Sequence, residues 1–339
     1  MRLVFVTQNV DPGSPVLGAT VAKVRALAAR VDEVAVLADR SVDGVLPGNC
    51  RVHLFSAGSR PGRGARFETA LAQELARSPR PAAVVAHMCP IYAVLAAPLA
   101  RPLGVRVLLW FTHWRASRLL QLAERLSTDV ITVEARSFPL RSNKVTAIGH
   151  GIDLAEFPCV TRPRSADLSL LTLGRTSPAK GLETVIRAVA RVPGTRLSQV
   201  GPSVTAEEWE HRAYLHALVT ELAVGDRVVI GEPVPRPEVA ALLASADALV
   251  NNMRAGATDK VVFEAAATCL PVLSSNPALD AFLPESLRFG RDDVNGLADR
   301  IQALPSLDLQ RLGLELRSQV ERDHSVEGWA DRVIGIASG

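Results

Sequence analysis

Short apolar runs alternate with longer amphipathic stretches along most of this chain. Runs of four to six apolar residues suit buried parallel strands, and segments with helical periodicity separate them. The first half predicts strands near 2–7, 33–38, 51–55, 82–87, 105–110, 128–133 and 144–148, and helices near 18–31, 64–77, 91–102 and 116–126. The second half predicts strands near 168–173, 196–201, 227–230, 247–251 and 271–275, and helices near 181–192, 206–222, 236–245 and 258–269. This alternation predicts an α/β protein.

The rhythm is interrupted by residues 158–167 (PCVTRPRSAD), whose two prolines and polar residues are typical of a linker. We therefore expect two doubly wound, Rossmann-like parallel-sheet domains, residues 1–155 and 165–322, facing each other across a cleft. Ligands are expected in that cleft, because strand carboxyl ends and helix N-termini present unpaired N–H groups there.

The last residues, 323–339, predict a helix that begins at the cap candidate Ser325. This helix is expected to pack back toward the first domain. Trp329 is expected to be a packing anchor rather than a ligand contact.

Composition is that of a globular protein. The 339 residues suffice for two domains with full cores, 48% are hydrophobic, and no apolar stretch approaches the roughly 18 to 20 residues of a membrane span. The start, MRLVFVTQN, lacks the apolar core and cleavage site of a secretory signal, so we expect a cytoplasmic protein. Cys50, Cys89, Cys159 and Cys269 lie far apart without paired spacing, which predicts inert thiols rather than disulfides or a zinc site.

The two halves differ in charge. Residues 1–150 contain 19 Lys+Arg and 10 Asp+Glu, a net charge of +9, and the remainder has a net charge of −6. A basic half suits an anionic substrate or peripheral contact with an anionic membrane, although a solvated arginine-rich face without function is an equal alternative. We expect no nucleic-acid partner. Lysine is rare, and two of the four lysines, Lys180 and Lys260, fall in the motifs that follow.

The second domain opens with a buried strand that runs into GRTSPAKG. Arg175 and Lys180 lie there beside the start of an amphipathic helix. An arginine fork, a mobile lysine charge and a helix N-terminus together suit a pyrophosphate. The alternative is that both are solvated loop cations.

Two features of the first domain lie at strand ends. The loop after Thr7 delivers Gly18 to a helix, but no G-x-G-x-x-G is present, so a plain βα turn is the alternative. His113 in WFTHW follows an apolar strand and is expected in the cleft, the alternative being an ordinary packing residue. Residues 87–92 (HMCPIY) are expected on the acceptor side, and His150 is expected to be a structural turn residue.

Residues 245–276 (SADALVNNMRAGATDKVVFEAAATCLPVLSSN) combine a strand, a loop with Gly256, a helix with Glu264 and a second strand. This segment resembles the C-terminal signature of the retaining family 4 (group 1) glycosyltransferases of the GT-B fold. GRTSPAKG is similar to that family's phosphate-binding Arg and Lys pattern, and residues 149–157 (GHGIDLAEF) to the segment that ends its first domain. The resemblance covers residues 145–275 and extends more weakly to Gly18 and His113.

The resemblance implies roles for individual residues. Glu264 corresponds to the second glutamate of the family's Glu-x7-Glu motif and would anchor the ribose. We place the first glutamate, which supports the transferred sugar, at Ala257, whose side chain cannot accept a hydrogen bond. Asp259 would substitute for it, or the donor sugar lacks that hydroxyl, or activity is lost. Lys260 would contact the donor or be a helix-surface cation.

The candidate site therefore has two groups of residues. The catalytic candidates are His113, Arg175 and Lys180. The donor-binding candidates are Gly18, Gly256, Ala257, Thr258, Asp259, Lys260, Val261, Glu264 and Val234, the last from the loop 231–234 expected beside the base.

The resemblance implies a retaining transfer of a sugar from a nucleoside-diphosphate sugar, UDP- or GDP-linked, to an acceptor hydroxyl, without a further cofactor. Cations and N–H groups of residues 256–261 would stabilise the leaving diphosphate. The sequence contains no Asp-x-Asp pair and no His or Cys pair with ligand spacing, so no metal is expected. Alternatives are a non-catalytic nucleotide-sugar-binding protein and a sugar-nucleotide epimerase; a dehydrogenase is disfavoured because the dinucleotide fingerprint is absent.

Overall fold

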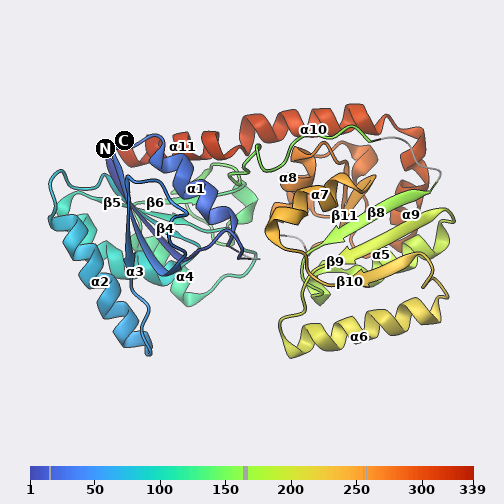
Figure 1. The fold of residues 1–339 in the computed structure, drawn as a ribbon, viewed down its shortest axis with the longest axis horizontal. Helices are drawn as coiled ribbons and strands as arrows, with labels where there is room; N and C mark the ends of the chain where they lie inside the picture. The colour runs from blue at the N-terminus through green and yellow to red at the C-terminus, as the bar shows by residue number, and fades with distance from the viewer. Residues whose placement is uncertain (15–16, 163–166, 255, 257) are drawn as a thin grey trace. The chain divides into compact units, whose positions relative to one another are not determined.

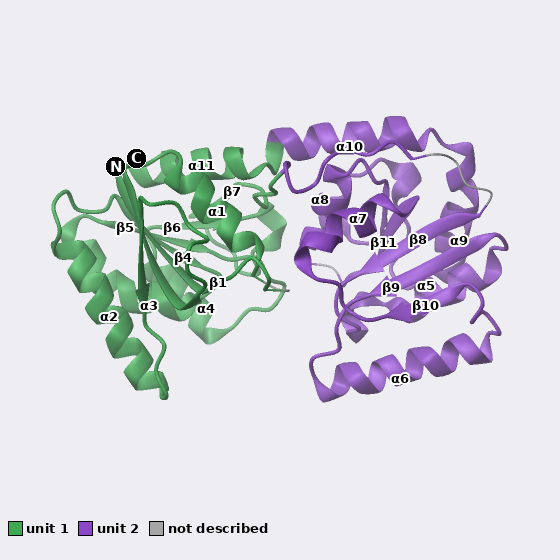
Figure 2. Cartoon of the chain, in the orientation of Figure 1, with its two compact units in different colours: residues 1–153, 323–339 green, residues 154–322 purple. Residues whose placement is uncertain are grey.

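A computed structural model of the chain describes residues 1–14, 17–162, 167–254, 256 and 258–339 (Figure 1). The chain forms two compact units (Figure 2): unit 1 comprises residues 1–153 and 323–339, and unit 2 comprises residues 154–322. Within these described residues, no helix combines the length and the apolar character needed to cross a membrane. The cytoplasmic location and the cleft between the domains stay predictions.

Unit 1 is built on a seven-stranded parallel sheet with the order β3-β2-β1-β4-β5-β6-β7. Its strands are β1 (Arg2–Val10), β2 (Glu33–Ser41), β3 (Cys50–Leu54), β4 (Ala83–His87), β5 (Arg106–Trp110), β6 (Asp129–Thr132) and β7 (Val145–Ala147). Its helices are α1 (Ala19–Ala28), α2 (Arg60–Ala76), α3 (Pro90–Ala100), α4 (Arg118–Leu126) and α11 (Val326–Ser338). The strand and helix positions expected from the apolar runs are confirmed to within a few residues, except at the start of α2.

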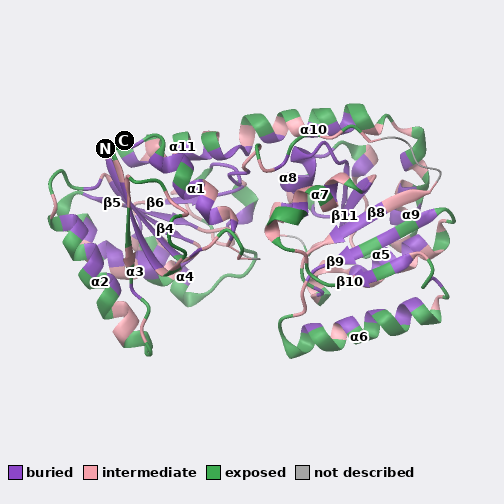
Figure 3. Ribbon diagram, viewed as in Figure 1, coloured by how far each residue is buried: buried purple, intermediate pink, exposed green. Residues whose placement is uncertain are grey.

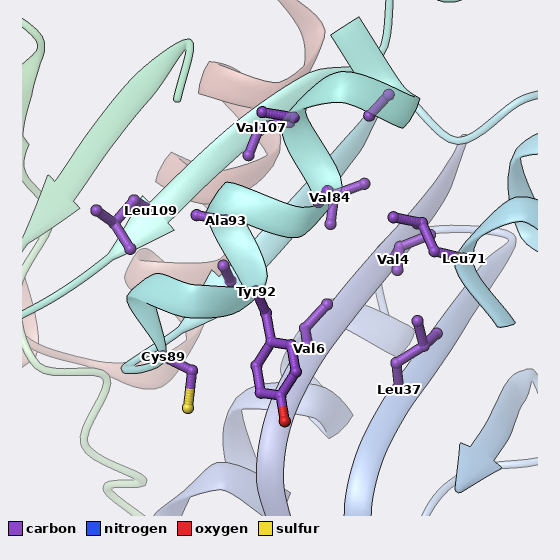
Figure 4. Close-up of a cluster of buried hydrophobic side chains, with 14 of the residues drawn as sticks. Val4, Val6, Leu37, Leu71, Val84, Cys89, Tyr92, Ala93, Val107 and Leu109 are labelled. Carbon is purple, nitrogen blue, oxygen red and sulfur yellow. The ribbon is translucent and has the colours of Figure 1, made fainter. Parts of the chain in front are cut away.

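The central strands of unit 1 are buried on both faces, which is why they read as continuous apolar runs (Figure 3). Alternate residues point to opposite faces of the sheet. Val4 and Val6 pack in the core under α2 and α3 (Figure 4). Trp110, on the opposite face, meets Trp329 of α11 edge-on, with 5.7 Å between ring centroids. The prediction that Trp329 is a packing anchor is confirmed.

The chain returns to unit 1 through residues 323–326. Ser325 pairs with Ile152 as an isolated parallel bridge, and Val326 N–H donates to the Ile152 carbonyl at 2.8 Å. Ser325 also caps α11 by accepting a hydrogen bond from Gly328 N–H. Gly149 has a φ of +75°, and a Cβ there would collide with the Asp323 carbonyl oxygen. Gly149, the first glycine of GHGID, is therefore required by this close backbone approach.

Unit 2 contains a five-stranded parallel sheet with the order β10-β9-β8-β11-β12. Its strands are β8 (Leu168–Leu173), β9 (Thr195–Val200), β10 (Val228–Gly231), β11 (Ala248–Asn251) and β12 (Val272–Ser274). Its helices are α5 (Leu182–Arg191), α6 (Ala206–Glu221), α7 (Val239–Ala244), α8 (Lys260–Ala267), α9 (Val294–Ala303) and α10 (Leu309–Asp323), the last residue of α10 belonging to unit 1. Residues 163–166 of the expected linker lie outside the described residues.

Three helices differ from the expectation. Helix α2 begins four residues earlier, because Ser59 accepts a hydrogen bond from Gly62 N–H and Pro61 fits the first turn. Helices α9 and α10 were not predicted. Between β12 and α9 the chain forms short 3₁₀ turns, so the simple strand-helix rhythm ends before these helices begin.

The expectation of four inert thiols is wrong for two cysteines. Cys159 and Cys269 form a disulfide between residues 110 positions apart in the chain. It ties the first residues of unit 2 to the end of α8, and a separation of this size gives no local spacing from which the pair could be predicted. Cys50 and Cys89 are free, and burial raises their pKa values to about 11 and about 12, which keeps both thiols protonated at neutral pH.

Removing the disulfide is expected to destabilise unit 2. A Cys159→Ser variant should lose about 2–4 kcal/mol of unfolding free energy, because the unfolded chain regains the freedom of a long closed loop. Urea unfolding with and without a dithiol reductant measures the effect. Cys50→Ser should unfold like the wild type, and an unreduced Cys159→Ser protein as stable as the wild type would contradict the bond.

Candidate functional site

The sequence-predicted residues of unit 2 gather at the carboxyl edge of its sheet. Residues 174–181 connect β8 to α5, and residues 252–259 connect β11 to α8. Because β8 and β11 are neighbouring parallel strands, both connections leave the sheet at the same edge. This is the edge at which ligands bind in open parallel sheets.

The two loops are held against each other by backbone and amide groups. Gly181 begins α5 with a φ of +56°, and a Cβ there would collide with the side chain of Asn252. Asn252 Nδ2 donates to the Gly181 carbonyl at 3.0 Å, and Arg254 N–H donates to the Ala179 carbonyl at 2.9 Å. The glycine of GRTSPAKG thus allows the loop to approach the β11 end closely.

Lys180 forms an ion pair with Asp259 at the centre of this arrangement. Asn251, the last residue of β11, donates through Nδ2 to the same Asp259 carboxylate oxygen at 3.1 Å. Lys180 lies at the end of a 3₁₀ turn (Pro178–Lys180), and Asp259 immediately precedes α8. Because Asp259 immediately precedes α8, its partner Lys180 lies at the same loop as the first N–H groups of that helix. The side chain of Asp259 does not cap these N–H groups.

Glu264 is a buried carboxylate with two cationic partners. Its side chain is 4% exposed, yet Oε1 is 2.6 Å from Arg236 Nη1 and 2.9 Å from Lys260 Nζ. Burial raises the pKa of Glu264, but the charges of Lys260 and Arg236 outweigh this and hold it below its usual value. Glu264 is therefore an ionised buried carboxylate, and Lys260, left open as a surface cation, is one of its partners.

Arg236 connects Glu264 to the start of unit 2. It lies in a 3₁₀ turn (Arg236–Glu238) and its Nε is 2.7 Å from Glu156 Oε1. The guanidinium carbon lies 4.8 Å from the centroid of the Phe157 ring, so the cation also stacks on an aromatic face. Sequence analysis missed Arg236 and Glu156, although Arg236 lies two residues after the segment 231–234 and Glu156 lies within the segment 149–157.

Arg175 lies at the start of the same loop as Lys180 but faces another partner. Its side chain is 55% exposed, and Nη1 is 3.2 Å from Oε1 of Glu208, the capping-box residue of α6. Both predicted diphosphate cations thus have carboxylate partners in this structure.

The remaining donor candidates take different places. Thr258 and Val261 are buried at the start of α8, and Val234 is half-buried between β10 and the turn that carries Arg236. Ala257 lies outside the described residues. Counting seven intervening residues back from Glu264 gives Gly256 as the first motif position, so its placement at Ala257 is wrong by one residue. Neither residue carries a carboxylate.

Gly18 and His113 belong to unit 1. Gly18 precedes α1 in ordinary right-handed conformation. His113 is exposed after β5, where its Nδ1 accepts a hydrogen bond from Arg115 N–H at 3.0 Å and its ring stacks on Trp114. Across the ranges that the structure describes, no group of three or more His, Cys, Asp or Glu residues is arranged to hold a metal ion.

Known proteins resemble parts of this chain. The sequence model of the family "Glycosyl transferases group 1" matches residues 160–280, the part of unit 2 that contains the site. Glycogen synthase of Mycobacterium tuberculosis is 32% identical over 139 residues, covering 39% of this chain and 32% of that protein. The lipopolysaccharide core biosynthesis glycosyltransferase LpsE of Rhizobium meliloti is 32% identical over 130 residues, covering 38% and 34%. The match spans about a third of the length of each of these relatives.

Solved structures resemble the whole chain. Sucrose-phosphate synthase from Thermosynechococcus elongatus has a TM-score of 0.79 at 20% identity, covering 99% of this chain and 98% of that one. Anabaena Alr3699/HepE, in complex with UDP-glucose, has a TM-score of 0.79 at 16% identity, covering 100% and 99%. The expected GT-B fold is confirmed, and the family match and relatives support a group 1 glycosyltransferase.

Arg236 is expected to be essential for the stability of unit 2. An Arg236→Met variant should lose about 3–5 kcal/mol of unfolding free energy, because it leaves the buried Glu264 carboxylate with one cation fewer. The pKa of Glu264 should rise, so the loss should be larger at neutral pH than near pH 4, where the carboxyl becomes protonated. Denaturant unfolding at both pH values measures this.

A matched control is Arg196→Met, which removes an exposed pair with Asp167 and should change the unfolding free energy by less than about 1 kcal/mol. Equal losses in the two variants would show that the Glu264 cluster has no special role.

Proposed function

We propose that the protein is a retaining, metal-independent family 4 glycosyltransferase, which transfers a sugar from a nucleoside-diphosphate sugar to an acceptor hydroxyl. The observation that carries this proposal is the Lys180–Asp259 pair at the N-terminus of α8, with the ionised Glu264 one turn further along the helix. A lysine and a helix N-terminus suit a diphosphate, and a buried carboxylate suits the two hydroxyls of a ribose. The family match to residues 160–280 supports the same assignment.

In this proposal the leaving diphosphate receives its developing charge at Lys180, Arg175 and the first N–H groups of α8. Such preorganised donors stabilise a transition state most strongly where water is excluded. Because Lys180 is paired with Asp259, the diphosphate must share or replace that carboxylate. The freed Asp259 would then accept hydrogen bonds from the sugar, the role that Gly256 has no side chain to perform.

The acceptor hydroxyl would attack on the face from which the diphosphate leaves, and the phosphate would take its proton. His113 of unit 1 would orient the sugar or the acceptor. Glu264, held by two cations, remains ionised and would accept hydrogen bonds from the ribose hydroxyls. UDP is the first nucleotide to test, because the HepE structure is described with UDP-glucose. GDP is the second.

A second candidate is a non-catalytic nucleotide-sugar-binding protein. The observation that favours it is Gly256, which places no carboxylate at the first position of the Glu-x7-Glu motif. Such a protein would bind the nucleotide through Lys180 and Glu264 but release no diphosphate with any acceptor.

Calorimetry with UDP, GDP and dTDP, and with their common sugar conjugates, tests the donor site. We expect one nucleotide to bind, and Lys180→Ala and Glu264→Gln to weaken its affinity at least tenfold, each by loss of a charged hydrogen-bonding group. Arg196→Met should bind like the wild type. The proposal fails if no nucleotide binds. Binding without donor hydrolysis or transfer would favour the non-catalytic alternative.

Asp259→Asn separates two roles of the same residue. Removing the carboxylate frees Lys180 from its partner, so the affinity for the nucleoside diphosphate should rise about three- to tenfold. Turnover of the nucleotide sugar should fall, because the acceptor for the sugar hydroxyls is weakened. Calorimetry with the diphosphate and a diphosphate-release assay measure the two effects, and unchanged diphosphate affinity would show that Asp259 does not compete for Lys180.

A further inference from the structure

An apolar groove of about 750 Å³ lies on unit 1 between the early turns of α2, α3 and α4. Ile91 and Leu95 of α3 and Leu119 of α4 line it, together with residues 60–68 of α2. Tyr92, also in the lining, is buried and packs on Phe67 with 4.8 Å between ring centroids. The groove therefore rests on the core of unit 1 and is large enough for a chain of many carbon atoms.

Apolar side chains continue from the groove onto the surrounding surface. Ile91 and Leu119 are each 40% exposed, and Leu122, one turn after Leu119 on α4, is 45% exposed. Leu120 and Ala123 are the residues that α4 buries, and Leu119 and Leu122 lie on its exposed side. One exposed leucine is ordinary, but several that adjoin an apolar groove indicate a surface that contacts another apolar phase.

The rim of the groove is positively charged. Arg60 and Arg63 line the groove, and residues 58–66 and 112–119 contain three further arginines, Arg66, Arg115 and Arg118, and no acidic residue. Helices α2 and α4 both begin within these segments, so the positive ends of their dipoles add to the same surface. Arg63 pairs with Asp39 at 3.6 Å, and Glu68 also lines the groove, but the balance of charge remains positive.

We propose that this face of unit 1 binds the surface of an anionic lipid bilayer, with an acyl chain in the groove and lipid phosphates against the arginines. A bilayer fits better than a single soluble amphiphile, because Leu122 and Trp114 are exposed but do not line the groove. Apolar residues ringed by cations are the pattern of a surface that inserts shallowly among anionic headgroups. The proposal does not depend on the glycosyl transfer proposed above.

Co-sedimentation of the full chain with vesicles tests this surface. We expect at least tenfold stronger binding to phosphatidylglycerol–phosphatidylcholine vesicles than to pure phosphatidylcholine, and weakening as salt rises. Arg118→Gln should weaken binding about fivefold, which corresponds to about 1 kcal/mol for one arginine near the membrane. Leu119→Ser combined with Leu122→Ser should weaken binding to the anionic vesicles at least tenfold.

Filling the groove gives the sharpest variant. A Cβ at Gly64 would have Leu95 Cδ1 as its neighbour at 3.9 Å, so α2 accepts a side chain there and Gly64→Leu would occupy the groove. We expect at least fivefold weaker vesicle binding. Gly335→Leu is the matched control, because a Cβ at that glycine of α11 meets no atom within 4 Å. Thermal unfolding of both variants establishes that the fold is intact.

Any of the following results would overturn the proposal. Absence of vesicle binding, or equal binding to both vesicle types, excludes an anionic bilayer as the ligand. Equal binding by Gly64→Leu and Gly335→Leu excludes the groove. Binding of monomeric dihexanoyl-phosphatidylglycerol without vesicle binding would assign the groove to a soluble amphiphile instead.

Discussion

One carboxylate oxygen, Oε1 of Glu264, holds the candidate site of unit 2 together. A buried carboxylate is costly unless it is paired, and Arg236 and Lys260 both pair with this oxygen. Arg236 also binds Glu156 and stacks on Phe157, so the first residues of unit 2 are fixed to α8 through the same cluster. Since Asp259 directly precedes α8, the place of the Lys180–Asp259 pair depends on this helix being held.

The other end of α8 is fixed by different means. Arg162 donates through Nη1 to the carbonyls of Thr268 and Cys269, each at 3.1 Å, where the negative end of the helix dipole favours a cation. The disulfide from Cys269 to Cys159 ties the segment that contains Cys159 and Arg162 covalently to the end of this helix. An isolated helix of eight residues would be marginal. Anchored at both ends, α8 can present its N-terminus in a fixed position.

The two units use helix N-termini and cations in different ways. In unit 2 the cations Lys180 and Arg175 are matched by Asp259 and Glu208, so an anionic ligand must compete for a charge that is already balanced. Such competition favours a ligand with several charges in defined positions. In unit 1 the arginines beside the groove exceed the carboxylates, and the charge is spread over a surface. This arrangement favours a broad anionic surface over a single small ligand.

The sequence alone determined the elements whose causes are local. Apolar runs predicted the strands because strands buried on both faces need continuous apolar side chains, and GRTSPAKG and Glu264 were identified from short motifs. Tertiary structure alone decided the pairs that cross the chain: Lys180 with Asp259, 79 residues apart, Arg236 with Glu264, 28 apart, and Cys159 with Cys269, 110 apart. Periodicity encodes which face a residue takes within its own element. Lys180 and Asp259 meet because their connections leave the neighbouring strands β8 and β11 at one edge, and the other two pairs form where α8 packs against the turn at Arg236 and the first residues of unit 2.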